Sequence, residues 1–154
     1  MDVANSPRRL RTLPSWLLGQ LSMEARRAVD GVLAEAGLHR SQYALLAALD
    51  EFGQLSQTAL SERSGLDRSD VVRWVDDLGE QRLVERSQDP SDRRRNVISI
   101  TEPGRRRLTQ LDKQLAQANK ELLAALPAAD QRQLVSLLGR VIGVPRDDRL
   151  HAGD

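Results

Sequence analysis

The sequence contains no cysteine, which excludes disulfide bonds, thiolate metal sites and cysteine redox chemistry. Its only two histidines, His39 and His151, lie far apart along the chain, so a histidine metal site is not expected. Aromatic residues make up only 3% of the chain, so the core must consist mainly of Leu, Val and Ala, which favours helices. We therefore expect neither a metal nor a cofactor.

Long apolar runs are also missing, and no stretch approaches the length of a membrane span. The N-terminus lacks the apolar segment of a signal peptide, so we expect a cytoplasmic protein without a membrane partner. There is no Gly-rich phosphate loop, nucleophile elbow or metal-ligand cluster. The adjacent carboxylates of Asp76 and Asp77 would point about 100° apart on a helix and would not converge on one site. An enzyme is therefore the least favoured function.

The length of 154 residues suits one domain with a real core, and 29% charged residues are typical of a soluble chain. The net charge of +1 does not by itself indicate a nucleic-acid partner. The distribution of charge is more informative, because residues 93–107 contain six arginines and a single acid, Glu102.

Apolar residues recur at helical spacing over residues 12–35, and Gly37 is placed to end this first helix. The polar and basic residues 1–11 show no periodicity and are expected to form a flexible arm. We expect Ser41 to cap a second helix, which Gly53 closes.

A helix–turn–helix pattern follows. Ser56 is placed to cap a short helix through Arg63, Gly65 supplies the turn, and Asp67 is expected to cap the next helix, with Asp70 in its first turn. Two short helices held by a tight turn can place the second helix in a DNA major groove. A helical hairpin without any ligand would share much of this pattern.

Residues 83–87 and 96–100 read as two strands around the turn residues Asp89-Pro90-Ser91-Asp92, which predicts a β-hairpin. Its tip continues into Arg93, Arg94 and Arg95, and a slender basic loop can enter a narrow minor groove. An ordinary solvated run of charges is the alternative. The position of the tip directly after a helix–turn–helix favours DNA.

The remaining segment, residues 102–144, predicts two helices separated by Pro127. The first of them carries a heptad-like series of apolar residues, namely Leu108, Leu111, Leu115, Ala118, Leu122 and Ala125. Such a series is a liability when it is exposed on a monomer, so we expect a partner surface here. Residues 145–154 read as a polar tail.

Together these motifs resemble the winged helix–turn–helix of the MarR family of bacterial transcriptional regulators. The resemblance spans roughly residues 12–143. It is carried by Leu66-Asp67-Arg68-Ser69, Arg73, Val75, Leu78, Leu83-Val84-Glu85-Arg86, Asp89-Pro90-Ser91-Asp92-Arg93-Arg94, Ile98, Ile100-Thr101 and Gly104. It implies a mainly α fold in which residues 38–101 form the DNA-binding region and residues 12–37 and 102–144 form a helical dimerisation region.

The resemblance also implies a homodimer that binds double-stranded DNA at a palindromic operator, usually as a repressor. A small aromatic or phenolic ligand is expected to release this homodimer from the DNA. Carried over by position, the DNA-contacting residues fall into three groups. The backbone-facing helix start has Ser56, Gln57 and Thr58; the recognition helix has Arg68, Ser69, Asp70 and Arg73; the wing has Asp92, Arg93 and Arg94.

The sequence departs from the family pattern because it has acidic residues at two positions of the recognition helix. Asp70 stands where a small hydroxyl residue is common, and Asp77 where a basic residue is common. Residues 63–95 contain eight arginines and eight acids, so the reading head is nearly neutral. We therefore expect weaker or more salt-sensitive DNA binding, or a specialised operator. A winged helix that serves as a protein-interaction module, having lost DNA, is the alternative function.

The family places effectors between the dimerisation helices and the winged domain. The candidates are Trp16, Gln20, His39 and Tyr43, which offer aromatic walls and a few polar groups. The plainer interpretation is that Trp16 and Tyr43 pack in cores and that His39 is a surface loop residue. Trp74, in the recognition helix, is expected to be structural, because large aromatic residues at helical spacing usually bury area.

Overall fold

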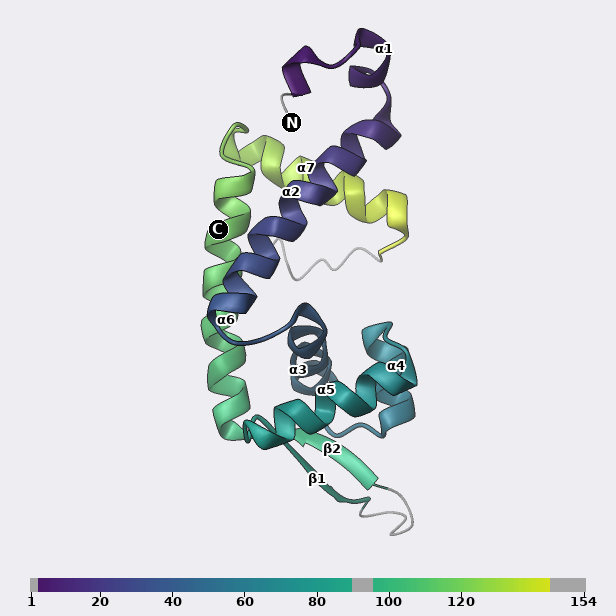
Figure 1. Cartoon of the computed structure of the whole chain (residues 1–154), viewed down its shortest axis with the longest axis vertical. Helices are drawn as coiled ribbons and strands as arrows, with labels where there is room; N and C mark the ends of the chain where they lie inside the picture. The colour runs from purple at the N-terminus through teal and green to yellow at the C-terminus, as the bar shows by residue number, and fades with distance from the viewer. Residues whose placement is uncertain (1–2, 90–95, 145–154) are drawn as a thin grey trace. The chain divides into compact units, whose positions relative to one another are not determined.

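A computed structural model describes residues 3–89 and 96–144 of the chain. The described chain divides into two compact units, residues 1–119 and 120–154. Helices dominate, together with one two-stranded antiparallel sheet, which confirms the predicted fold class (Figure 1). In chain order the elements are the 3-10 turn η1 Val3–Asn5, α1 Arg8–Arg11, α2 Pro14–Glu35, α3 Arg40–Phe52, α4 Gln57–Ser64, α5 Arg68–Glu80, β1 Val84–Gln88, β2 Asn96–Ile100, α6 Glu102–Leu122 and α7 Ala128–Ile142.

The core of the first unit lies where α3, α5, the sheet and α6 meet. These elements contribute Leu, Val and Ile side chains, as the scarcity of aromatic residues requires. Its best-buried members include Leu45, Leu46, Leu49, Leu60, Val71, Val75, Leu78, Ile98 and Leu111. The buried face of α5 recurs every three or four residues, so the opposite face of this helix is left to solvent.

The start of α3 differs from the prediction, because His39 and not Ser41 occupies the N-cap. The His39 ring accepts a hydrogen bond from the Ser41 amide at 3.2 Å, and the His39 amide donates to the Gln42 side chain at 2.8 Å. This reciprocal pair satisfies two amides at the helix end. Ser41 lies one residue inside the helix, where it is buried.

The helix–turn–helix forms as expected. Ser56 caps α4, with its Oγ accepting from the Ala59 amide at 3.2 Å, and Gly65 ends the helix in the left-handed region at φ 68°. Asp67 does occupy the N-cap of α5, but its side chain makes no capping hydrogen bond, so that part of the prediction was wrong. The turn is held instead by the Ser61 hydroxyl, which donates to the Leu66 carbonyl at 2.5 Å.

The hairpin pairs Val84 with Ile100 at its base and Gln88 with Asn96 at its far end. Leu55 extends the pairing through two backbone hydrogen bonds with Ile98, of 3.0 and 2.8 Å, and so ties the segment before α4 to the sheet. The predicted wing tip lies outside the described residues, and with it the candidates Asp92, Arg93 and Arg94.

The junction between the hairpin and its neighbours is tightly packed. Arg82 adopts the left-handed conformation at φ 58°, a region that favours glycine. The Thr101 hydroxyl donates to the Arg82 carbonyl at 2.8 Å and accepts from the Gly104 amide at 3.1 Å. A side chain at Gly104 would meet the Leu83 carbonyl oxygen at 2.1 Å, so only glycine fits at this place.

Two expectations about the ends of the first unit need correction. Residues 8–11, which were expected to belong to a flexible arm, form the short helix α1. In α6, the first members of the heptad-like series, Leu108, Leu111 and Leu115, are buried in the chain's own core. That part of the series therefore does not offer a surface to a partner.

The arginine-rich run after the hairpin also makes structural contacts. Arg105 forms an ion pair with Asp50 of α3, and Arg107 donates to the Ala36 carbonyl at the end of α2. Arg106 pairs with Glu102 at 3.2 Å within α6. Three of the six arginines that suggested a nucleic-acid partner therefore hold α6 to its surroundings or to itself.

The second unit contains α7, which begins after Pro127. The Gln131 amide nitrogen donates to the carbonyls of Leu123 and Leu126 at 3.1 and 2.9 Å and so fixes the turn before the helix. Large apolar side chains on α7 are exposed, namely Val135, Leu137, Val141 and Ile142. No helix within the described ranges has the length and apolar character needed to cross a membrane.

Candidate nucleic-acid interface

A groove of about 980 Å³ lies between the start of α4, the exposed face of α5 and the hairpin. The start of α4 contributes Ser56, Gln57 and Thr58, the residues predicted to meet a DNA backbone. Val72 and Asp76 line it from α5, and β1 contributes Arg86. The structure therefore brings the predicted backbone-contacting residues beside the predicted recognition helix.

The start of α4 is suited to hold a phosphate. The Ser56 hydroxyl already accepts from the Ala59 amide, whereas the amides of Gln57 and Thr58 stand in the first turn, where a helix offers no acceptor of its own. These amides lie at the positive end of the helix dipole, and anions are stabilised there.

The N-terminal half of α5 places Arg68 and Ser69 in solvent. Arg73 is also exposed, and its guanidinium lies 3.9 Å from the Asp70 carboxylate and 4.1 Å from the centre of the Trp74 ring. Asp70 stands in the first turn of the helix, where a negative charge is favourable. The four recognition-helix candidates thus share one end of α5, and Arg73 is held by its neighbours.

The acids of α5 do not act together on the groove. Asp76 forms an ion pair with Arg86 of β1, with an N–O distance of 2.6 Å, so its charge is compensated inside the groove. Asp77 and Glu80 line a different cavity. The lining of the groove carries two carboxylates, Glu62 and Asp76, against the single guanidinium of Arg86.

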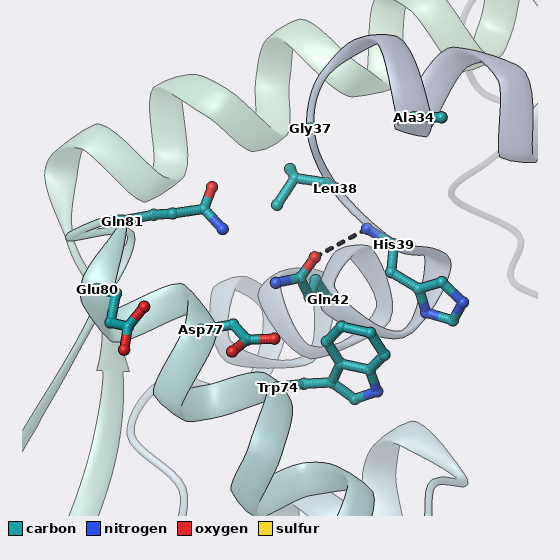
Figure 2. A pocket seen from close by; sticks show the side chains of 9 residues that line it. All are labelled: Ala34, Gly37, Leu38, His39, Gln42, Trp74, Asp77, Glu80 and Gln81. Carbon is teal, nitrogen blue, oxygen red and sulfur yellow. Dashed lines mark hydrogen bonds between the residues drawn. The ribbon is translucent and has the colours of Figure 1, made fainter.

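The second cavity, of about 410 Å³, is lined by nine residues from the end of α2, the start of α3 and α5 (Figure 2). The rings of His39 and Trp74 stack in it, with centres 4.6 Å apart and planes within 7° of parallel. Gln42 also lines it and is only 3% exposed. Of the four effector candidates, His39 alone belongs to this lining.

The other three effector candidates lie elsewhere in the first unit. Trp16 and Gln20 are half-buried residues of α2. Tyr43, on α3, donates from its hydroxyl to the Asp112 carboxylate of α6 at 2.8 Å. Burial raises the pKa of Tyr43 to about 12, and the bond to Asp112 and the charge of this carboxylate act in the same direction. The phenol is thereby kept protonated.

Sequence reasoning missed Gln42, Asp77 and Glu80 as lining residues of this cavity. A signal was present, because Trp74, Asp77 and Gln81 are spaced by three and four residues and so share one face of a helix. Trp74 itself packs against the core as predicted, and it lines the cavity as well.

Comparisons with known proteins agree with this architecture. A family model described as the MarR family matches residues 36–95. YdgJ, a helix–turn–helix-type transcriptional regulator of Bacillus subtilis, is 31% identical over 115 residues, which are 73% of this chain and 70% of YdgJ. The transcriptional repressor NicR of Pseudomonas putida is 29% identical over 101 residues, 66% of this chain and 64% of NicR.

Among solved structures, the PcaV transcriptional regulator of Streptomyces coelicolor, in complex with its natural ligand, matches with a TM-score of 0.72. It is 32% identical, and the match covers 90% of this chain and 97% of PcaV. These proteins are regulators and not enzymes, in agreement with the prediction from the sequence. The chain belongs to the MarR family of transcriptional regulators.

Proposed function

We propose that this chain is a repressor that binds double-stranded DNA as a homodimer on a near-palindromic operator and leaves it when a small molecule binds. The observation that carries the proposal is the groove, because it combines the start of α4, the exposed face of α5 and the hairpin in one surface. This combination suits a major-groove helix with a phosphate contact beside it.

Each group of residues has its own role in the proposal. The amides at Gln57 and Thr58 hold a phosphate, which positions the protein without reading sequence. Arg68, Ser69 and Arg73, with Asp70 close by, face base edges and the neighbouring backbone. The wing arginines Arg93 and Arg94, braced by Asp92, enter the minor groove.

The homodimer is supported by exposed apolar side chains on two long helices. They are Leu13, Leu17, Leu18 and Met23 on and before α2, and Val135, Leu137, Val141 and Ile142 on α7. Apolar surface of this kind marks an interaction site when it is contiguous. A two-fold dimer would set two recognition helices about 34 Å apart, one turn of DNA.

Repression and release are supported by relatives. NicR is named a repressor, and PcaV was solved with its natural ligand. The cavity at His39 and Trp74 gives this chain a place of suitable size beside the recognition helix.

Selection of bound fragments from a random DNA pool tests the proposal. We expect enrichment of a near-palindrome, with affinity that falls as salt rises. Arg68→Ala should weaken binding to that site, whereas Arg26→Ala, an exposed arginine of α2, should leave it unchanged. If no sequence is enriched at low salt, the DNA-binding function is wrong and the protein-interaction module takes its place.

A further inference from the structure

Val72 is the large apolar side chain of α5 that lies exposed. It is 41% exposed, whereas Val71, Val75 and Leu78 on the core side of the same helix are at most 1% exposed. Valine is also a weaker helix former than alanine, because its branched side chain loses rotamer freedom in a helix. Neither burial in the core nor helix propensity therefore accounts for a valine at this position.

Val72 lines the groove that is proposed to receive DNA. The lining is mostly polar and includes the start of α4, where a phosphate is proposed to bind. Ile98 also belongs to the lining but is only 1% exposed, and Ala59 has a single methyl group. Val72 thus offers the large aliphatic surface that a molecule in this groove can contact.

The neighbours of Val72 place it on the reading face of α5. Ser69 precedes it by three residues and Asp76 follows it by four, so the three side chains share one side of the helix. Asp76 is paired with Arg86 of β1 at 2.6 Å, which leaves Ser69 and Val72 on this side to meet base edges. Since α5 begins at Arg68, Val72 lies in its second turn, within the N-terminal part that reaches the bases in a recognition helix.

We propose that Val72 is a specificity-determining residue that contacts the C5 methyl group of a thymine in the major groove. This inference rests on the proposed function. Among the four bases, thymine alone presents a methyl group in the major groove. A valine side chain neither donates nor accepts a hydrogen bond, so it would leave the amine of a cytosine or an adenine without a partner. Thymine is therefore the base that Val72 selects, once in each half-site of the operator.

Removal of single methyl groups from the selected operator tests the contact. Deoxyuridine pairs as thymidine does but lacks the C5 methyl group, and each thymine of one half-site is replaced in turn. At one of these positions we expect the wild type to bind roughly fourfold more weakly, the value of one methyl group transferred from water. Fluorescence anisotropy of the labelled operator measures the affinity.

Val72→Ala shows whether the lost affinity belongs to Val72. Alanine lacks both γ-methyl groups, and at an exposed helical position it should not lower the free energy of unfolding. The same deoxyuridine replacement should change the affinity of Val72→Ala by less than about twofold, because the two changes remove one shared contact. Glu51→Ala, at an exposed position of α3 outside the groove lining, should keep the full loss.

A second base change separates the methyl group from the rest of the base. A cytosine–guanine pair is placed at the sensitive position and compared with 5-methylcytosine–guanine, which returns the methyl group to the same edge. The wild type should bind the methylated site roughly fourfold more tightly. Val72→Ala should not distinguish the two sites.

The proposal is overturned if the operator is bound specifically but no thymine shows a methyl contribution that Val72→Ala abolishes. A selected half-site without any thymine would overturn it as well. Both results leave the proposed function in place. If no sequence is enriched from the pool, the proposed function is wrong and the thymine contact is rejected with it.

Discussion

Gly104 shows most directly how a single residue limits this fold. A Cβ atom there would lie 2.1 Å from the Leu83 carbonyl oxygen and 2.8 Å from Ile100, and the carbonyl belongs to rigid backbone. We expect Gly104→Ala to lower the free energy of unfolding by about 3 kcal/mol, the upper range for overpacking.

The matched control is Gly79→Ala. Gly79 lies in α5 with nothing within 4 Å of the added methyl group. Gly79 lies in the last turn of the helix, so its replacement by alanine should raise the free energy of unfolding by about 0.5 kcal/mol, the lower end of the range for helix interiors. Urea denaturation measures both variants, and a Gly104→Ala protein as stable as the wild type would contradict the packing at Leu83.

Tyr43 makes a pH-dependent contribution to stability. Its pKa is raised to about 12 from an ordinary value near 10, so the folded state keeps the proton that the unfolded chain loses first. The stabilisation is therefore complete below about pH 10 and is lost as the pH rises toward 12. Urea denaturation at a series of pH values should show that Tyr43→Phe is less stable than the wild type at neutral pH. The difference between their free energies of unfolding should narrow between pH 10 and about 12. A constant difference up to pH 12 would rule out the raised pKa.

At this scale, sequence reasoning succeeded where the local chemistry allowed one solution. Ser56 and Gly65 are in their predicted roles because each is the only suitable residue at its helix end. It failed at His39, because a histidine ring is rarely considered as a cap and Ser41 offered the more usual hydroxyl. Gln42 decides which residue is the N-cap, because its side chain accepts from the His39 amide. This bond is recognisable only when the backbone direction at the helix start is known.

At the scale of elements, the start of α4 has a stabilising role and a proposed DNA-binding role that substitutions can separate. Ser56→Ala removes the cap and should cost about 1 kcal/mol of stability. Ser56→Asp keeps a capping oxygen but places a negative charge where a phosphate is proposed to bind, so DNA affinity should fall while stability is retained. Thermal unfolding and band shifts, run in parallel, check the pair. Equal DNA affinity of Ser56→Asp and the wild type would remove α4 from the interface.

Helices α2 to α6 were predicted from the sequence, because each buries apolar side chains in the core, whereas α1, which buries none, was missed. Periodicity does not reveal which surface covers that face. The series of Leu108, Leu111 and Leu115 in α6 looked like a seam for a partner, yet the chain's own core covers it. The same limit applies to the acids of α5, which the fold divides between an ion pair and a separate cavity.

For the molecule as a whole, the exposed apolar residues of α7 carry the prediction of a homodimer. Val141→Asp combined with Ile142→Asp places charges on two of its most exposed apolar positions. We expect light scattering to show a shift from dimer to monomer, and the operator affinity to fall roughly a hundredfold as the two half-sites lose their linkage. Gln133→Asp, an exposed polar position on the same helix, is the control. A doubly substituted protein that remains dimeric would place the dimer contact elsewhere.

The ion pair between Asp76 of α5 and Arg86 of β1 has a consequence for the operator itself. In the proposed complex with DNA, this ion pair couples movements of the recognition helix to movements of the hairpin. Base changes in the major groove and in the adjoining minor groove should therefore have non-additive effects on affinity. Asp76→Ala removes the ion pair, so in this variant the effects of major-groove and minor-groove base changes on DNA affinity should become additive.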